Sequence, residues 1–177
     1  MARVAAAAVI SVLITACSGA GPSASAVKQS PSNTARATSS SSPAVPTGAA
    51  RKALAARYLA IAVAGNRRLE IDFDGLEGRD RDNLARARAD LRDAAATERL
   101  FDRRLLAIVF PAGTERIARA LVWLNTYRAA LTMRAAGSRT LAQLRGYEPR
   151  LSAANRPVEQ AVRLIRGELG LPPPETS

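Results

Sequence analysis

Four runs of apolar residues at helical spacing constrain what this chain can fold into. Within residues 51–171, leucine, isoleucine, valine, alanine and aromatic residues recur every three or four positions, which places them on one face of a helix. The stripes comprise Leu54, Tyr58, Ile61, Gly65 and Leu69; Leu84, Ala87, Leu91, Ala94, Phe101, Leu105 and Ile108; Ile117, Leu121, Leu124, Tyr127 and Leu131; and Leu141, Leu144, Leu151, Val158, Val162, Ile165 and Leu169. No stretch alternates polar and apolar residues for long enough to predict a strand.

Short breaks rich in glycine and proline separate the four runs. They contain Gly75 and Gly78, then Pro111 and Gly113, then Gly137 and Ser138, while Gly170 and Pro172 follow the last run. Such residues favour helix ends, and Asp80 or Asp82 and then Thr114 are candidate N-caps for the second and third helices. Because short connections place successive helices antiparallel, the sequence predicts an all-α fold, an antiparallel up-down four-helix bundle over residues 51–171.

The fourth run contains two prolines, Pro149 and Pro157. A proline in the interior of a helix costs about 3 kcal/mol and kinks or breaks the helix. The apolar stripe nevertheless keeps its phase from Leu141 to Leu169. We therefore expect one kinked helix here rather than two separate helices.

The N-terminus has the pattern of an export signal. Arg3 precedes an apolar run over residues 4–15, and small residues lead up to Cys17, the only cysteine of the chain. The apolar run is shorter than the roughly 20 residues that span a bilayer as a helix. Residues 14–17, Ile-Thr-Ala-Cys, resemble the lipobox of bacterial lipoproteins, at which the cysteine is lipidated and the signal peptide is cut.

This resemblance covers residues 1–17 only and implies where the protein lies. Residues 1–16 would be removed as a signal peptide, and Cys17 would become the lipidated first residue, with acyl chains such as palmitate. Two acyl chains hold a protein stably, since each buried methylene contributes about 0.8 kcal/mol. The predicted location is the extracytoplasmic face of the cell membrane, with the lipid bilayer as a partner through Cys17. The alternative is an ordinary signal peptide in which Cys17 is incidental.

Residues 17–50 consist mostly of serine, alanine, proline, threonine and glycine. Only Val27 and Val45 are larger apolar residues in this segment, so it buries too little apolar surface to offset the entropy of ordering the chain. We expect a disordered linker over residues 17–50 between the lipid anchor and the bundle. A short C-terminal tail over residues 172–177 follows the last helix.

The residue types that are missing exclude most catalytic chemistry. The chain has no histidine and no cysteine after Cys17. Histidine-dependent triads, imidazole and thiolate metal sites and disulfides in the bundle are therefore excluded. We predict no catalytic residue, no cofactor and no metal, and we expect that the protein is not an enzyme.

Ten of the 15 acidic residues lie between Glu70 and Asp102. The densest part, residues 70–77, has acids at alternate positions before Gly75, which resembles half of a calcium-binding loop between two helices. Counted from Glu70, the twelfth position is Arg81, a cation where the bidentate carboxylate of such a loop must lie. We instead interpret these acids as carboxylates near the N-terminus of the second helix or paired with arginines.

The net charge of the chain is +11, and 24 of its 26 basic residues are arginine. This charge favours anionic partners, while a coding bias toward GC-rich codons would give the same composition. We expect a structural or interaction role in which the basic bundle contacts anionic lipid, wall polymer or an envelope protein. The arginines are spread along the helices rather than concentrated on one element, so no nucleic-acid partner is predicted.

Trp123 and Tyr127 lie four residues apart, on one face of the third predicted helix. Aromatic residues of this kind fit the edge of a core, where the ring packs and its polar atom reaches water. The alternative is a pocket near the third helix lined by these two residues, which would make the protein a small-ligand-binding bundle. Asn66 and Asn125 fall in mid-helix, where they are candidates for hydrogen bonds across the bundle.

Overall fold

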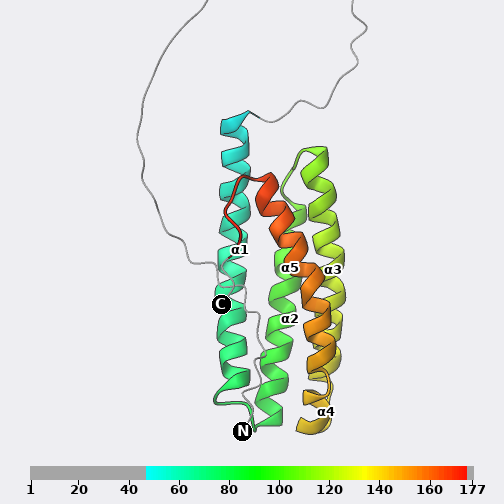
Figure 1. The fold of residues 1–177 in the computed structure, drawn as a ribbon. Helices are drawn as coiled ribbons and strands as arrows, with labels where there is room; N and C mark the ends of the chain where they lie inside the picture. The colour runs from blue at the N-terminus through cyan, green and yellow to red at the C-terminus, as the bar shows by residue number, and fades with distance from the viewer. Residues whose placement is uncertain (1–46, 175–177) are drawn as a thin grey trace, which may run out of the picture.

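The computed structural model describes residues 47–174, and these residues form five helices and no strand. The helices are α1 (Gly48–Glu77), α2 (Leu84–Leu106), α3 (Ala112–Ala136), α4 (Leu141–Arg145) and α5 (Glu148–Glu168). The four long helices run antiparallel in chain order, and the short α4 turns the chain from α3 into α5 (Figure 1). The predicted all-α antiparallel bundle is confirmed.

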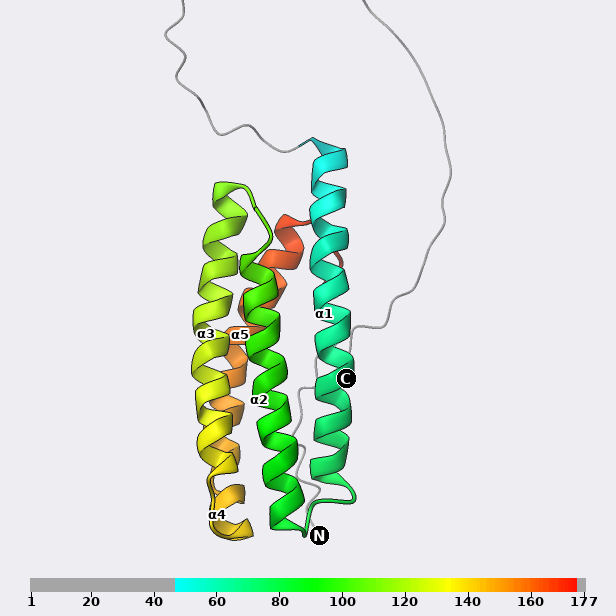
Figure 2. The ribbon, with the colours of Figure 1, turned by 180° about the vertical axis from the view of Figure 1, so that it is seen from behind.

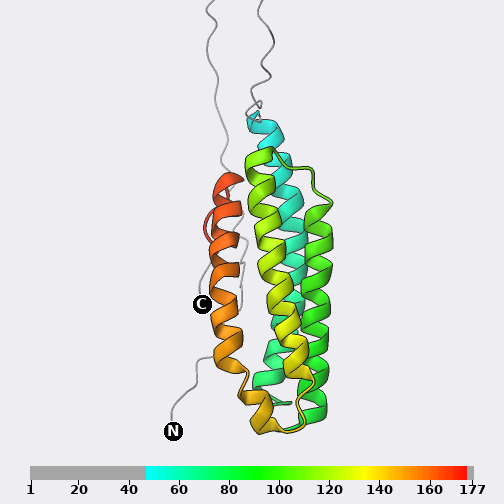
Figure 3. The ribbon, with the colours of Figure 1, turned by 90° about the vertical axis from the view of Figure 1, so that its right-hand side faces the viewer.

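Three of the four helix pairs around the bundle pack closely. α1 packs against α2, α2 against α3, and α3 against α5. α2 and α5 occupy opposite corners, since α5 lies in front in Figure 1 and α2 lies in front in the reverse view of Figure 2. The fourth pair, α1 and α5, has far fewer close backbone approaches than the other three. Figure 3 shows α5 standing to one side of the other long helices.

The main apolar core fills one half of the bundle, which we call the closed half and define by Tyr58, Leu105, Leu121 and Ile165. These side chains come from the four long helices, and none of the residues is more than 1% exposed. The ring of Tyr58 meets that of Phe101 edge to face, with 6.5 Å between the ring centroids. Each fully buried side chain of this size contributes about 1.5–3 kcal/mol, so the closed half is the main source of stability.

The other half of the bundle, next to α4, is the open half and has a much smaller apolar cluster. Its buried members are Leu91 of α2 and Ala135 and Ala136 of α3. The partly buried residues that surround them are Leu76, Leu144, Tyr147 and Leu151. Two of the three buried members are alanines, so the open half is filled less completely than the closed half.

Side-chain caps begin three of the helices. The side-chain oxygens of Thr47, Asn83 and Thr140 each accept a hydrogen bond from the backbone N–H three residues later, at the starts of α1, α2 and α4. The prediction that Asp80 or Asp82 caps α2 is therefore wrong. Asp80 is instead buried in the α1–α2 connection, where two arginine side chains donate to its carboxylate.

Two helices extend past the ends that the glycines suggest. α1 continues through Gly75 to Glu77, and α3 begins at Ala112, so that Thr114 is buried within its first turn and does not cap it. Gly75 has a packing role instead, because a Cβ at this position would lie 3.0 Å from Oδ2 of Asp90. The glycine leaves room for the carboxylate of Asp90 on α2 and does not end a helix.

The fourth run forms two helices, so the expectation of a single kinked helix is wrong. Two residues separate α4 from α5, and Pro149 lies in the first turn of α5. A proline is tolerated there because the first N–H groups of a helix have no partner within it. Pro157, by contrast, lies inside α5, which continues through it. The stripe keeps its phase because Leu144 of α4 and Leu151 of α5 pack on the same cluster.

The predicted signal peptide, Cys17 and most of the predicted linker precede residue 47 and lie outside the described residues. α1 starts at Gly48, three residues before the predicted start of the bundle. Within residues 47–174, none of the helices combines the length and the apolar character needed to cross a membrane.

Candidate functional site

A cavity of about 530 Å³ occupies the open half of the bundle. Its volume falls within the range of about 300–1,000 Å³ that is typical of small-molecule sites. All five helices contribute to its lining, and its walls include Leu69 and Phe73 of α1, Leu91 of α2 and Leu151 of α5. The cavity is therefore suited to an apolar molecule of appreciable length.

The cavity has a local cause in the sequence. Ala87 of α2, Ala135 of α3 and Ser152 of α5 line it, and none of these side chains is large enough to fill the space between the helices. α1 and α5 have few close backbone approaches, so no tight helix pair closes this side of the bundle. Interiors of proteins are usually close-packed, which makes a space of this size a candidate binding site rather than ordinary packing.

A polar cluster lies where the closed half meets the cavity, and we call it the polar junction. It consists of the buried residues Glu98, Asp102 and Asn125 and the partly buried Arg128 and Asn155. Nε of Arg128 lies 3.0 Å from Oε1 of Glu98, close enough for an ion pair but without the alignment of a hydrogen bond. The Arg128 guanidinium also donates to the amide oxygens of Asn125, at 2.8 Å, and of Asn155. The side chain of Glu98 is only 3% exposed.

Asn125 holds the polar junction to α2. Its Nδ2 donates to Oδ1 of Asp102 at 2.8 Å and to the backbone carbonyl of Glu98 at 3.3 Å. The hydroxyl of Thr126 donates to the other oxygen of Asp102 at 3.4 Å. The predicted hydrogen bonds across the bundle are therefore confirmed for Asn125. They are not found for Asn66, whose Nδ2 is buried without a partner.

Burial dominates the electrostatics of the two acids in the polar junction. Burial raises the pKa of Glu98, and the ion pair with Arg128 opposes this rise. Burial also raises the pKa of Asp102, against the hydrogen bonds from Asn125 and Thr126, which favour the charged form. Both carboxyl groups therefore hold their protons more tightly than they would in water.

Three buried polar atoms of residues that line the cavity have no hydrogen-bond partner within the described part of the chain. They are Nδ2 of Asn66, Oε2 of Glu98 and Nε of Arg128, and the last of these faces Oε1 of Glu98 in the ion pair. All three residues line the main cavity and also a neighbouring cavity of about 40 Å³ in the closed half. An unsatisfied buried group costs about 1–3 kcal/mol and is uncommon in folded proteins. Apart from Nε of Arg128, which Glu98 faces, one donor and one acceptor are thus available at the inner end of the cavity.

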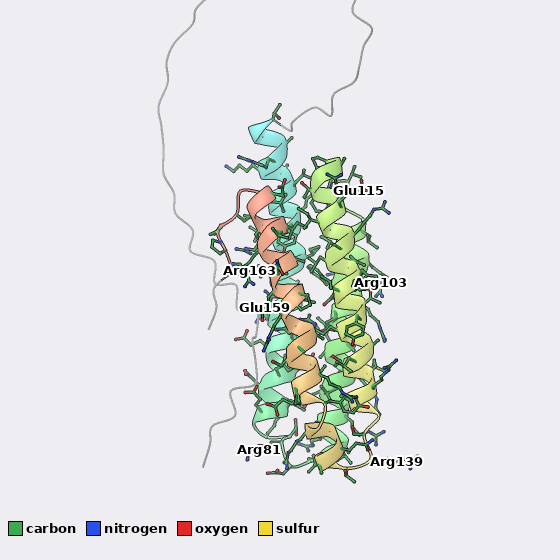
Figure 4. The ribbon with its side chains drawn as sticks, turned by 45° about the vertical axis from the view of Figure 1, so that its right-hand side comes forward. Arg81, Arg103, Glu115, Arg139, Glu159 and Arg163 are labelled. Atoms are coloured by element: carbon green, nitrogen blue, oxygen red, sulfur yellow. The ribbon has the colours of Figure 1, made fainter. Side chains whose placement is uncertain are left out.

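Charged side chains line the opposite end of the cavity, near the α1–α2 connection and α4. They include Arg81, Arg145, Glu77 and Glu148, and Figure 4 shows Arg81 at this end of the bundle. Burial, and then the nearby carboxylates of Asp74 and Glu148, raise the pKa of Glu77. The cavity is therefore apolar along its length, with hydrogen-bonding atoms at one end and mixed charges at the other.

The acidic segment at residues 70–77 belongs to α1 and is not a loop between helices. Within residues 47–174, no group of three or more acidic residues is arranged to hold a metal ion. The interpretation as ion pairs is wrong for Glu70, Asp72 and Asp74, which form none in this range, whereas Asp80 and Asp82 do pair with arginines.

Trp123 and Tyr127 point away from the bundle. They are 71% and 60% exposed, and neither lines the main cavity or the small one. Both interpretations from the sequence, the edge of the core and a pocket lined by these two residues, are therefore wrong. α3 does line the main cavity, but with a different face, which includes Arg128 and Ala135.

Sequence reasoning missed Glu98 and Arg128, although a signal was present. Glu98 lies seven residues after Leu91, and Arg128 lies four residues after Leu124, so each charge falls on the apolar stripe of its helix. Charged residues are seldom fully buried unless they are paired. A charge on each of two apolar stripes therefore indicates a buried ion pair between the helices.

Comparisons of the chain with protein-family models, with characterised proteins and with solved structures find no significant match.

Proposed function

We propose that the protein is a lipid-anchored extracytoplasmic binding protein whose bundle takes up a small, elongated and mainly apolar molecule. The observation that carries this proposal is the cavity of about 530 Å³ in the open half. Pockets of this size with apolar walls and a few polar groups are the usual form of a small-molecule site. The lipid anchor at Cys17 and the extracytoplasmic location are supported by the lipobox resemblance of residues 14–17.

The polar atoms of the cavity restrict the chemistry of the ligand. Its apolar body would lie against the leucine walls, and its polar group would reach the inner end. That group would accept a hydrogen bond from Nδ2 of Asn66 and donate one to Oε2 of Glu98. A hydroxyl or a primary amide can do both. Each bond would remove the cost of leaving a buried group unpaired.

An interaction role for the basic surface, as expected from the net charge, is compatible with this function. The main cavity and the exposed arginines of α2 and α3 occupy different parts of the bundle, because Arg92, Arg99 and Arg103 are exposed and line neither cavity. Ligand uptake and contact with an anionic envelope component could therefore occur in the same molecule.

The test is the binding of the apolar fluorophore N-phenyl-1-naphthylamine, which becomes fluorescent in apolar surroundings. Leu151→Trp places a larger side chain on the cavity wall. Leu164→Trp is the matched control, because Leu164 lies on the same helix, is 54% exposed and lines neither cavity. A chain of residues 47–177 should bind about one molecule, and Leu151→Trp should weaken binding by at least about tenfold, or about 1.4 kcal/mol.

Urea unfolding should show that both variants remain folded. Equal binding by the wild type and the two variants would contradict the proposal, because the fluorophore would then lie outside the cavity. Absence of saturable binding to the folded wild type would also contradict it.

A further inference from the structure

Exposed apolar side chains gather on α2, α3 and their connection. Of the six large apolar residues that are strongly exposed within residues 47–174, four belong to this region: Leu106, Val109, Trp123 and Tyr127. Val109 is 84% exposed and Trp123 is 71% exposed. Single exposed apolar residues are ordinary, but a group of them among charged residues marks an interaction site.

Arginines share the outward surface of α3 with the two aromatic residues. Arg116, Trp123, Tyr127 and Arg134 are separated by seven, four and seven positions, a spacing that places them on one side of the helix. All four are exposed. The two aromatic rings therefore lie between two arginines on this side of α3, with Arg116 toward the start of the helix and Arg134 toward its end.

A second row of arginines follows α2 beside this surface. Arg92, Arg99, Arg103 and Leu106 are separated by seven, four and three positions and are exposed. Asp102, next to Arg103 in the chain, points toward α3, where it accepts a hydrogen bond from Thr126. The arginine row therefore lies toward the α3 side of α2. We call the eight residues of the two rows, together with Val109, the α2–α3 face.

Acidic side chains are kept off the α2–α3 face. The five acids of residues 84–136 are Asp90, Asp93, Glu98, Asp102 and Glu115. Asp90 and Asp93 lie near Asp72 of α1, because their charges help to raise its pKa. Glu98 and Asp102 are buried. Glu115 is engaged by Arg119, with 2.7 Å between the charged atoms. The α2–α3 face therefore carries positive charge from its arginines, and each carboxylate of α2 and α3 is buried, paired or directed toward α1.

We propose that the α2–α3 face docks on the surface of an anionic lipid bilayer. An arginine near such a surface contributes about 1 kcal/mol, and tryptophan and tyrosine favour the membrane–water interface. No residue of the face lines the main cavity or the small one, so the face is suited to a broad charged surface and not to an inserted chain.

The position of the face fits attachment to the same membrane. The start of α1 and the α2–α3 connection lie at the same end of the bundle (Figure 1). A chain that comes from an anchor at Cys17 therefore enters the bundle at the end that carries Leu106 and Val109. The docking uses the proposed anchor only to bring the face near the bilayer and does not depend on ligand binding in the cavity.

Trp123 is the only tryptophan of the chain and reports docking directly. The acylated full-length protein is placed in phosphatidylcholine vesicles, with or without phosphatidylglycerol, that contain lipids brominated near the headgroup end of the acyl chains. With phosphatidylglycerol at low salt, Trp123 fluorescence should be quenched and shifted to shorter wavelength. Without phosphatidylglycerol, or at about 1 M salt, where the screening length falls to about 3 Å, both effects should be lost.

The double variant Arg99→Gln and Arg103→Gln should shift the docked fraction toward the undocked form by up to about 30-fold, the equivalent of about 1 kcal/mol per arginine. The matched control is Arg57→Gln with Arg67→Gln, which removes the same charge from exposed positions of α1. The control should dock like the wild type. Equal losses in both double variants would show that net charge alone attracts the protein and would overturn the proposal.

Two further readouts separate the possible failures. Flotation with uncharged vesicles tests the lipid anchor alone. A protein that floats with these vesicles, but whose Trp123 fluorescence is not quenched on anionic vesicles, contradicts the docking proposal and leaves the anchor proposal intact. If Trp123 stays open to aqueous acrylamide on anionic vesicles and is shielded only by a soluble acidic polymer, the partner is a polymer and the proposal is wrong.

Discussion

Individual residues in the polar junction distinguish this bundle from one with a wholly apolar core. Arg128 pairs with Glu98 and donates to two asparagines, so its guanidinium contacts partners on both α2 and α5 as well as on its own helix. Removing one partner of such a buried pair typically costs about 3–5 kcal/mol. Oε2 of Glu98 nevertheless has no partner within residues 47–174. A polar group retained in this state, on the wall of a cavity, is consistent with a site that awaits a ligand.

Asp72 gives a prediction at the residue scale, because its burial, and then the nearby carboxylates of α2, affect its charge. Burial, and then Asp93 of α2, raise the pKa of Asp72 from its usual 3.8 to about 6, against the effect of Arg68. Between these two pH values the folded protein binds the proton more tightly than the unfolded chain. The free energy of unfolding therefore falls as the pH rises from about 4 to about 6.

Asp72→Asn removes the ionisable group and therefore this loss of unfolding free energy with rising pH. We expect the variant to be more stable than the wild type above pH 6 by about 1 kcal/mol, a value that allows for solvent screening at a partly exposed site. Near pH 4 or below, where the wild-type carboxyl group is protonated in the folded state, the two proteins should have nearly equal stability. Urea unfolding at the two pH values measures this difference, and a gain that is the same at both would contradict the assignment.

Some residues of the site could be predicted from the sequence, and others could not. The position of Asn125 in mid-helix predicted a hydrogen bond across the bundle, and the structure confirms it. The exposure of Trp123 and Tyr127 was missed, because a spacing of three or four residues does not fix the edge of the buried face. A residue next to the true stripe can fit the same spacing. Tyr127 is four residues from Trp123 but lies off the face that Leu121 and Asn125 bury.

The helices themselves follow from the sequence more closely than their ends do. Apolar periodicity located the four long helices, because burial of one face is the main source of their stability. Glycine was a weaker guide, since Gly75 leaves room for the carboxylate of Asp90 and does not end α1. The break before α5 was missed because Leu144 and Leu151 keep one stripe across two helices.

The two prolines of the last run give a prediction at the scale of the element. Pro157 lies inside α5, where it cannot donate the backbone hydrogen bond of an ordinary helical residue, whereas Pro149 lies in the first turn. Pro157→Ala should therefore stabilise the protein by about 1–3 kcal/mol. Pro149→Ala is the control and should change stability little, since the first turn has no internal partner for that N–H.

Thermal or urea unfolding of the two proline variants measures this comparison. A larger gain from Pro149→Ala than from Pro157→Ala would contradict the assignment of the break to residues 146–147. Circular dichroism should show that helix content is kept in both variants.

At the scale of the whole molecule, the bundle is uneven along its length. The closed half holds the large buried side chains of all four long helices, while the open half contains the cavity. The closed half is thus the main source of stability and the open half holds the proposed binding site, so the cavity can remain open without unfolding the bundle. Periodicity in the sequence cannot reveal this division, because it shows which face of a helix is buried but not how closely two buried faces meet.

The most direct test of the central claim is mass spectrometry of the molecules that copurify with the full-length protein from its own membrane. We predict one mainly apolar component at about one molecule per chain, present with the wild type and with Leu164→Trp and lost from Leu151→Trp. Membrane lipid carried along without specific binding would be the same in all three. An identical set of molecules in the three samples would contradict a ligand site in the open half.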